Sequence, residues 1–331
     1  TTVDGNTQDQ TVTITYSADA QKATINYIDD TAGKTLHSET VNGHTGEAIA
    51  DPKEAIANYK KQGYQLASDD LAKGASFDND DKTDQAFYIH LNHNIETITP
   101  DKPKTPSDII PGTGKHYPSG VDKDDLNKTV TRTINVISPD GKTTTIKQPV
   151  TLQRSATVDD VTGQITYKAW NTGKWEEYDT PQISGYTPSP AKVSATTVDG
   201  NTQDQTVNIT YSANAQKAGI KYIDDDTKET LSTDTDNGKG KFGQPITFRT
   251  DPAKTIKDYE DQGYKLVTNN FKTTDTYQAD NNKNQFEVHF MHGTTDVTPD
   301  KPKTPSDIIP GTTKHYPSGV DKDDLNKTVT R

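Results

Sequence analysis

Several side chains in this 331-residue sequence have types and spacings that could support chemistry. Gly238-Lys-Gly-Lys-Phe-Gly243 matches the G-x-G-x-x-G pattern of dinucleotide-binding loops. That pattern binds pyrophosphate when it lies between a buried strand and the start of a helix. Here Asp234 and Asp236 precede it, and a segment with strand character follows it at 246–248. We therefore interpret the motif as a loop insertion and predict that it binds no nucleotide.

An acidic loop at 78–84 brings Asp78, Asp80 and Asp84 close together in sequence, and hard cations prefer such oxygen ligands. Calcium takes about six to eight oxygens, and the glycine and distal glutamate of a helix-loop-helix site are not in place. The related loop at 280–284 keeps few carboxylates. A solvated turn is the interpretation that we favour, and a metal site at these three residues is the alternative.

Two histidines near the end of a predicted strand, His90 and His93, recur as His289 and His292. Residues three apart in a strand point to opposite faces of the sheet, so the two histidines of one pair are not expected to share a metal ion. We expect His90 on the outer face, where protonation at acidic pH would change the local charge.

The two tryptophans of the chain, Trp170 and Trp175, lie close in sequence to Tyr178. Exposed aromatic rings can bind the C–H faces of sugars, and ligand sites combine aromatic surfaces with polar groups. These three residues are therefore our candidate ligand-binding residues. Trp170 also continues an alternation that begins at Ile165 and Tyr167, so packing into the core is the alternative for both tryptophans.

Known catalytic patterns are missing from the sequence. It contains no G-x-S-x-G, H-E-x-x-H or phosphate-binding loop pattern. Acidic residues are plentiful, but a glycosidase needs two carboxylates positioned in a cleft, and small β modules offer little cleft. We predict that the chain is not an enzyme and that it uses no cofactor.

The elements that must position these residues occur in repeats. Residues 101–132 return at 300–331, and the two copies differ only where Gly114 is replaced by Thr313. Residues 1–23 return at 196–218 with two changes. The copies are offset by 199 residues in the first case and 195 in the second. The chain is therefore interpreted as a window from a tandem array.

Helix-bearing modules are predicted at 20–95 and 214–293. In the first, residues 23–27 alternate apolar and polar side chains, a turn follows, and 35–41 return as the second strand of a hairpin. A helix comes next, and residues 86–91 again alternate as a closing strand. Hairpin, helix and further strands are the order of a β-grasp module.

The helix of each of these modules has recognisable ends. Asp51, followed by Pro52 and then Glu54, predicts an N-terminus with a capping box, and Gly63 predicts the C-terminus. The second copy keeps the aspartate as Asp251 but carries Lys254 in place of the glutamate. The helix is short, so packing against the sheet must hold it.

The remaining chain is predicted to form a linker and a mostly-β module. The prolines of 96–125 favour polyproline II, which indicates a semi-rigid linker or lead-in. Residues 1–19 are predicted to be the last strand of a preceding β module, with the strand itself at 10–16, and 294–331 to be a linker and the start of the next one. The module at 126–213 is expected to be all or mostly β, with strands at 129–137, 143–158, 165–170, 191–197 and 205–211.

Composition narrows the function further. Hydrophobic residues make up only 28% of the chain, which indicates several small modules with thin cores. The net charge of −12 argues against nucleic acid as a partner. Cysteine is absent, which excludes disulfides and thiolate chemistry, and no apolar run long enough to insert in a membrane is present. The sequence shows neither a signal peptide nor a wall anchor, which we expect outside this fragment.

These residues resemble a known family. The openings INYIDD and IKYIDD, the helix DPKEAIANYKKQGY, the ending FYIHLNH and the segments TVTRTINVISPDGK and TPQISGYTPSPAKV are similar to the repeats of mucus-binding adhesins of lactobacilli. The resemblance implies a cell-wall-anchored extracellular protein, β-grasp-like modules of both kinds, binding to mucin glycoproteins and, in some members, to immunoglobulins. The fold class expected is α+β, mostly β: an elongated tandem array of small β-grasp (ubiquitin-like) modules alternating with mostly-β modules.

The leading functional hypothesis is an adhesin segment, monomeric within its array, that binds mucin glycans through many weak sites. The alternatives are immunoglobulin capture and a passive stalk. A sheet edge could capture an immunoglobulin by strand addition, and the polar strand at 35–41 is the candidate edge.

Overall fold

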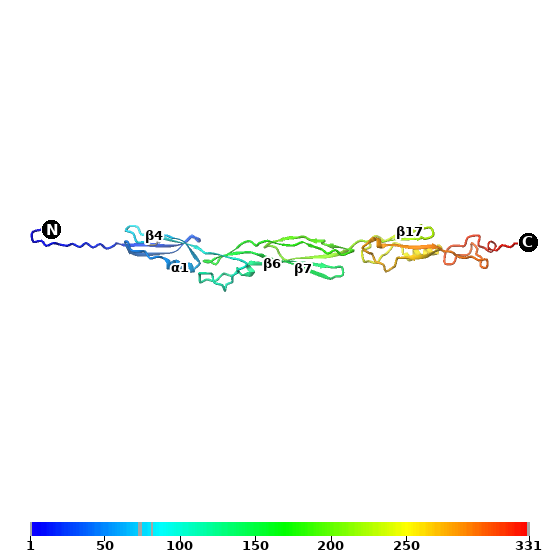
Figure 1. Cartoon of the computed structure of the whole chain (residues 1–331), viewed down its shortest axis with the longest axis horizontal. Helices are drawn as coiled ribbons and strands as arrows, with labels where there is room; N and C mark the ends of the chain where they lie inside the picture. The colour runs from blue at the N-terminus through cyan, green and yellow to red at the C-terminus, as the bar shows by residue number, and fades with distance from the viewer. Residues whose placement is uncertain (1, 72–74, 81, 330–331) are drawn as a thin grey trace. The chain divides into compact units, whose positions relative to one another are not determined.

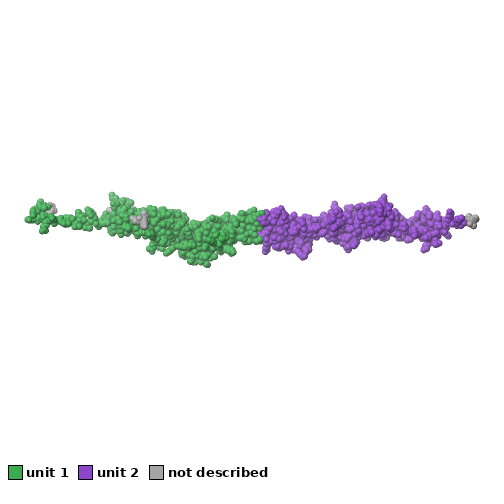
Figure 2. Space-filling model, viewed as in Figure 1, with its two compact units in different colours: residues 1–131, 149–175, 196–204 green, residues 132–148, 176–195, 205–331 purple. Residues whose placement is uncertain are grey.

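The computed structural model describes residues 2–71, 75–80 and 82–329, and these residues are mostly β. They form two compact units, which Figure 2 shows in different colours: residues 1–131, 149–175 and 196–204 in one, and residues 132–148, 176–195 and 205–331 in the other. Within the described residues no helix is long and apolar enough to cross a membrane.

The first helix-bearing module is a four-stranded sheet with one helix (Figure 1). Its elements in chain order are β1 (Ala20–Asp29), β2 (Lys34–His44), α1 (Lys53–Lys61), β3 (Tyr64–Asp69) and β4 (Gln85–His93). The strand order is β2-β1-β4-β3, with β1 and β4 parallel in the centre and the outer strands antiparallel to them. Because strand side chains alternate, Ile25, Tyr27, Ile89 and Leu91 face one side and bury Ile56 of α1. The predicted hairpin, helix and closing strand are confirmed.

The ends of α1 follow the sequence only in part. Gly63 follows the helix with a φ of +96°, a conformation that favours glycine, as predicted. The capping box is wrong, because the N-cap residue is Pro52 and no side chain caps the helix. Asp51 instead pairs with Lys53, whose ammonium lies 2.8 Å from its carboxylate. In the second copy Asp251 does cap its helix by accepting from the Ala253 amide.

The second helix-bearing module repeats this plan. Its elements are β16 (Gly219–Asp224), β17 (Thr230–Thr235), α3 (Pro252–Asp261), β18 (Tyr264–Asn269), a 3-10 turn η1 (Asn281–Asn284) and β19 (Gln285–His292). The order β17-β16-β19-β18 matches the first sheet, and β16 and β19 are parallel. Ile220, Tyr222, Val288 and Phe290 are buried where Ile25, Tyr27, Ile89 and Leu91 are buried in the first copy.

The proline-rich segment after β4 is packed rather than extended. It begins with β5 (Ile95–Ile98), continues through several turns and ends in α2 (Lys123–Leu126). Its apolar side chains Ile110, Tyr117 and Val121 are buried together with Val158 of β8 (Ala156–Asp159). The polyproline II spacer favoured by the prolines is therefore not found, because the isoleucine, tyrosine and valine between them contribute to a small core.

The β module that follows has its longest strands in one sheet. The order is β12-β15-β6-β7, and β15 runs parallel to β6. The strands are β6 (Asn127–Ile137), β7 (Thr143–Gln153), β9 (Ile165–Tyr167), β10 (Gly173–Trp175), β11 (Tyr178–Asp179), β12 (Tyr186–Ser189), β13 (Lys192–Val193), β14 (Thr196–Val198) and β15 (Gln205–Ala213). The strand predicted at 143–158 divides into β7 and β8, and the strand predicted at 165–170 ends at Tyr167.

Two small clusters stabilise this module. One consists of Val130, Leu152, Trp175 and Val198, and the other includes Ile134, Val193 and Ile209. The module also buries Arg132, whose guanidinium donates to Gln148 Oε1 at 2.8 Å and to the carbonyls of Ser194 and Glu176. Burial lowers the pKa of Arg132, and these three acceptors compensate its lost hydration.

The strand predicted at 10–16 is not in a sheet. Its apolar side chains are exposed, with Ile14 at 70% and Tyr16 at 88%. The equivalent segment 205–211 lies within β15, between β12 and β6. Alternation alone is therefore not sufficient here, because a strand needs neighbours to satisfy its backbone groups.

Candidate functional site

The three predicted ligand-binding aromatic residues do not form one exposed surface. Trp175 is buried at 2% exposure, so its ring cannot stack on a ligand. Trp170 is half-buried against the same cluster, and the Arg154 guanidinium lies 4.5 Å from its ring centre. Tyr178 packs against the other cluster of the β module. The core alternative is thus correct for Trp175.

The predicted acidic loop does not gather a metal site among the described residues. Asp78 Oδ1 accepts from the amide of Asp80, and Asp80 Oδ1 accepts from the amide of Lys82, which are ordinary turn contacts. Asp81 of this loop lies outside the described residues. Elsewhere in the described chain, Asp224, Asp226 and His292 do bring three potential ligand atoms within 4.8 Å of one another.

The G-x-G-x-x-G loop serves packing. A Cβ on Gly240 would lie 2.2 Å from the Tyr277 ring, so the glycine allows this ring to approach the backbone. Phe242 of the same loop packs edge-on against Tyr186 at 5.3 Å between ring centres, and its ring covers Gly185. The loop therefore holds the second helix-bearing module to the first residue of β12. The prediction of a loop insertion without a dinucleotide-binding context is consistent with this packing role.

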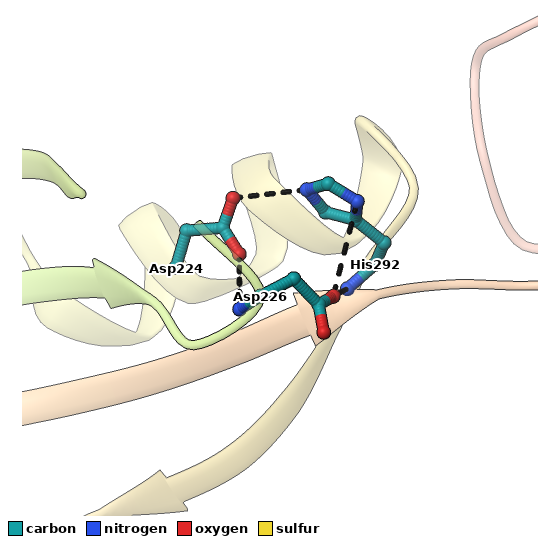
Figure 3. A group of neighbouring side chains, drawn as sticks. All are labelled: Asp224, Asp226 and His292. Carbon is teal, nitrogen blue, oxygen red and sulfur yellow. Dashed lines mark hydrogen bonds and ion pairs between the residues drawn. The ribbon is translucent and has the colours of Figure 1, made fainter. Parts of the chain in front are cut away.

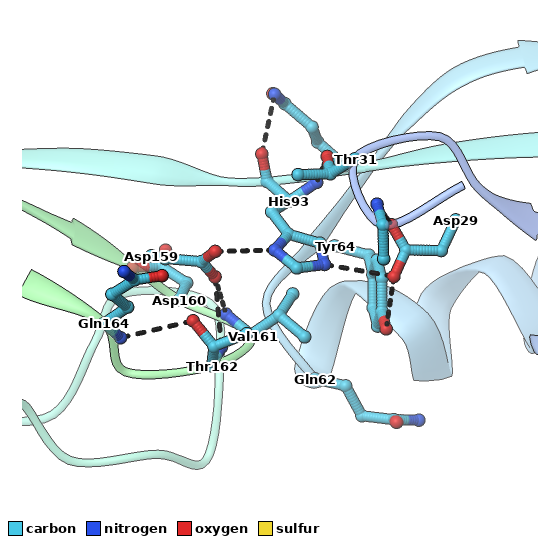
Figure 4. Close-up of polar contacts among 12 residues, drawn as sticks. Asp29, Thr31, Gln62, Tyr64, His93, Asp159, Asp160, Val161, Thr162 and Gln164 are labelled. Atoms are coloured by element: carbon cyan, nitrogen blue, oxygen red, sulfur yellow. Dashed lines mark hydrogen bonds and ion pairs between the residues drawn. The ribbon is translucent and has the colours of Figure 1, made fainter. Parts of the chain in front are cut away.

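His93 has the most elaborate polar environment in the first copy. Its Nδ1 lies 2.6 Å from Asp159 Oδ2 at the end of β8, and its Nε2 lies 3.1 Å from Asp29 Oδ2 at the end of β1. Figure 4 shows the imidazole between the two carboxylates, with Tyr64 on the side of Asp29. The Tyr64 hydroxyl also donates to Asp29, at 3.4 Å. A strand of the helix-bearing module is thus joined to the β module by a buried histidine.

The electrostatics of this triad favour a charged imidazole. Burial by itself would lower the pKa of His93, but the hydrogen bonds to Asp159 and Asp29 outweigh it and hold the pKa above its ordinary value. Burial would likewise raise the pKa of each carboxyl, but backbone amides and His93 hold the pKa of Asp29 and of Asp159 below the ordinary range. The arrangement is a buried ion-pair network that links the ends of β1, β4 and β8.

The turn at 159–163, here named the Asp159 turn, is held by further contacts. Asp159 Oδ1 accepts from the amides of Val161 and Thr162 and so shapes the turn. The Asp160 amide donates to Asn94 O at 2.9 Å. A Cβ on Gly63 would lie 2.5 Å from the Asp160 carbonyl carbon, so the turn is seated directly on this glycine.

A lysine completes the contact. Lys115 Nζ donates to the carbonyls of Gln62, Asp160 and Val161 at 2.8, 3.0 and 2.8 Å. Three carbonyls from two segments therefore converge on one ammonium, which locks the Asp159 turn to the C-terminal end of α1.

The second copy has the same residues in a more open setting. His292 Nε2 lies 2.9 Å from Asp224 Oδ2, as in the first copy, but its Nδ1 faces Asp226 at 3.8 Å (Figure 3). The His292 side chain is 56% exposed, against 6% for His93. Asp224 Oδ2 also accepts from Thr227, and the Asp226 carboxylate accepts from the His292 amide. These oxygens already have partners, and calcium would need about six to eight oxygens, so the group fits an ion pair better than a cation site.

A hollow of about 660 Å³ lies beside this histidine. We name it the His292 hollow, and its lining includes Gly263, Tyr264, His292, Gly293, Pro310 and Lys314. It is the counterpart of the place that the Asp159 turn occupies in the first copy, because Gly63, Tyr64, His93 and Lys115 correspond to Gly263, Tyr264, His292 and Lys314.

The sequence did not predict the role of His93. The prediction that His90 and His93 do not share a metal ion is consistent with their separate partners, since His90 pairs with Asp30 at 2.7 Å. A signal for the triad was present, because both copies carry an aspartate at the end of the first strand and a histidine at the end of the last. The parallel pairing of those strands places the two ends side by side.

Comparison with known proteins places each module in a family. Residues 21–93 and 216–292 match the Mucin binding domain, and residues 121–215 match the Muc B2-like domain. These matches cover most of the chain. No curated protein sequence matches it.

Parts of the chain are also similar to solved structures. The chain is 26% identical to the crystal structure of Mub-RV, with a TM-score of 0.46, covering 59% of this chain and 99% of that one. It is 28% identical to the type 2 repeat of the mucus binding protein MUB from Lactobacillus reuteri, with a TM-score of 0.38, covering 59% and 100%. It is 32% identical to the mucin-binding domain of Spr1345 from Streptococcus pneumoniae, with a TM-score of 0.25, covering 27% and 92%.

Two Mucin binding domains on either side of a Muc B2-like domain account for both kinds of repeat in the sequence. The chain therefore belongs to the family of mucus-binding repeat proteins.

Proposed function

We propose that this chain is a non-enzymatic adhesin segment that binds mucin glycoproteins at the surface of a Gram-positive bacterium. The observation that carries the proposal is the match of both helix-bearing modules to the Mucin binding domain. Two of the similar structures are named for binding mucus or mucin. Attachment to the cell wall, through a part of the protein outside this sequence, belongs to the same proposal.

We further propose that the helix-bearing modules are β-grasp modules and that each carries a weak site. The support for the fold is the order β2-β1-β4-β3 with a parallel central pair and a helix between β2 and β3. The support for multivalency is repetition within one chain, because a second site on the same chain binds at a high effective concentration once the first is occupied.

The open face of the first sheet is our candidate for the glycan contact in place of Trp175, which is buried. Tyr88 on this face is 42% exposed, and its ring lies 6.4 Å from that of His90. Asn26, paired opposite Tyr88, supplies amide groups beside it. An exposed aromatic ring among hydrogen-bonding side chains is the combination that sugar sites use. The second copy carries Glu287 at the position of Tyr88, so we assign the stronger site to the first module.

The proposal is tested by measuring binding of the 331-residue chain to immobilised purified mucin by surface plasmon resonance. We expect binding that is lost after the mucin is enzymatically deglycosylated. Because the chain carries a net charge of −12, binding to acidic mucin is not expected to strengthen when salt is lowered. Binding that survives deglycosylation would contradict a glycan-directed adhesin, and absence of binding would leave the role of a passive stalk.

Immunoglobulin capture is a second candidate, favoured by one observation. β2 is the outermost strand of the first sheet and pairs only with β1 among the described strands. Such an edge can accept a strand from another β protein. Retention of Fab or Fc fragments by the immobilised chain would support this function, and failure to retain either would remove it.

A further inference from the structure

We propose that the His292 hollow is a docking surface for the Asp159 turn of a further Muc B2-like domain. Each helix-bearing module, with the segment that follows it, carries a glycine, a tyrosine, a histidine and a lysine at corresponding positions. In the first copy the Asp159 turn fills the place beside the histidine, and in the second copy this place is open. The occupant in the first copy is part of the same chain, so its chemistry identifies what the second copy would bind. This inference is independent of mucin binding.

The contacts of the first copy define the requirements for an occupant. It must present a carboxylate to the histidine Nδ1, as Asp159 does to His93 at 2.6 Å. It must also bring backbone carbonyls to a lysine, as Asp160 and Val161 do to Lys115. Finally, its backbone must lie flat on a glycine, as Asp160 lies on Gly63.

The second copy offers each of these partners. His292 directs Nε2 to Asp224, at 2.9 Å, so its Nδ1 is the counterpart of the nitrogen that faces Asp159 in the first copy, and Asp226 lies 3.8 Å from it. Lys314 lines the hollow at the position of Lys115. A Cβ on Gly263 would meet nothing nearer than Thr312 Cγ2 at 4.0 Å, whereas one on Gly63 would strike the Asp160 backbone.

Apolar side chains near the hollow also lack the cover that they have in the first copy. Ile110, Val121 and Leu126 are buried there, packed with Ala156 and Val158 of β8. Their counterparts Ile309, Val320 and Leu325 are only half-buried in the described structure. A domain that places a strand equivalent to β8 over them would bury this surface as well, which adds a favourable hydrophobic contribution to the polar contacts.

The lead-in that precedes the occupant is also duplicated. Residues 300–331 repeat residues 101–132, which in the first copy run directly into the Muc B2-like domain. In the second copy this segment touches the end of α3, where the Thr313 amide and hydroxyl both donate to Asp261 O. It leaves the space over Gly263 open, so the lead-in itself is not the occupant.

The experiment extends the chain after Arg331 with a copy of residues 133–215, which follow Arg132 in the first copy. The added segment contains no histidine, so the extended protein keeps the same eight histidines as reporters. With ¹³C-labelled histidine, NMR at one fixed pH gives the imidazole chemical shifts of His292 in both proteins. We expect the extension to move the His292 resonances and to leave those of His289 unchanged, because His292 lines the hollow and His289 does not.

Two controls make the result specific. In the first, the added copy carries Asn at the position of Asp159, and the change in the His292 resonances should be lost while the His93 resonances stay unchanged. In the second, a synthetic peptide covering residues 155–168 is added to the unextended chain, so that the reading does not depend on folding of the extension. A His292 resonance that responds neither to a folded extension nor to the peptide overturns the proposal, and a response that the Asn variant retains overturns the assigned contact.

Discussion

His93 and Asp159 lie 66 residues apart in sequence and are joined by a hydrogen bond of 2.6 Å. One belongs to the first Mucin binding domain and the other to the Muc B2-like domain. With Asp29 on the other side of the imidazole, the contact is a charged bridge within one compact unit. This bridge therefore joins the Mucin binding domain to the Muc B2-like domain that follows it.

The joint should depend on pH. The pKa of His93 is raised above its ordinary 6.5, so its contribution is complete below pH 6.5 and is lost as pH rises through the raised value. The pKa values of Asp29 and Asp159 are lowered below 3.8, so their contribution is present above pH 3.8 and is lost as pH falls through the lowered values. We expect the slowest exchange of the Asp160 amide between these limits, after correction for intrinsic exchange rates.

The variant that tests this dependence is His93→Gln. It should flatten the alkaline side of the plot of Asp160 amide exchange against pH. His292→Gln is the matched control, because His292 is 56% exposed and its substitution should leave the exchange of the Asp160 amide unchanged. An unchanged profile in His93→Gln would assign the pH dependence to another group.

Asp159→Asn should weaken the joint without changing the size of the side chain. The substitution removes the charged partner of His93 and leaves a buried imidazole with Asp29 alone. We expect a loss of roughly 1.5–3 kcal/mol in the free energy of unfolding of this unit, the usual range for a hydrogen bond to a charged group. Chemical denaturation followed by tryptophan fluorescence measures it, since both tryptophans, Trp170 and Trp175, belong to the same unit. If the free energy of unfolding falls by only a few tenths of a kcal/mol, Asp29 alone is sufficient to stabilise the charged His93.

Gly63→Ala should be more harmful than Gly263→Ala. Both glycines have positive φ, at +96° and +97°, so the backbone strain of an alanine is the same in each. Only at Gly63 would the new methyl group strike a backbone, at 2.5 Å. We expect Gly63→Ala to cost about 1–3 kcal/mol more, the usual penalty of overpacking. Thermal unfolding of the two variants measures the difference, and equal losses would contradict the close seating of the Asp159 turn.

Tyr88→Glu should reduce mucin binding. The second copy carries Glu287 at this position, so the fold accommodates the residue. Loss of one exposed aromatic contact corresponds to about 1 kcal/mol, or roughly a fivefold weaker affinity. Glu287→Gln is the control and should bind as the parent chain does. Surface plasmon resonance on intact mucin measures both, and an unaltered affinity in Tyr88→Glu would move the contact away from this face.

Local patterns predicted the helix-bearing modules well. The alternation of Ile25 and Tyr27 specifies a strand with one buried face, and Gly63 marks the helix end because few residues other than glycine adopt its φ. Such features depend on neighbours in sequence, so they can be recognised from a single chain.

Long-range relationships were harder to predict. The prolines of 96–125 favoured an extended spacer, so the burial of Ile110 and Tyr117 was not predicted. That burial depends on β8, which follows some forty residues later. The Trp175 ring is of the type that stacks on ligands, but it is buried in a cluster with Val130 and Val198. His93 was interpreted from its own strand alone, and its decisive partner lies in another domain. In each case the contact is fixed by tertiary packing, which periodicity does not report.

The parallel pairing at the centre of each four-stranded sheet has a mechanical consequence. The chain enters the first module through β1 and leaves through β4, and these strands run side by side in the same direction. Tension applied at the two ends therefore shears the β1–β4 ladder, so that its hydrogen bonds must rupture together and not one after another. β16 with β19 and β6 with β15 have the same geometry. An adhesin built in this way should resist extension under flow, and single-molecule pulling is expected to record abrupt rupture of whole modules without gradual unzipping.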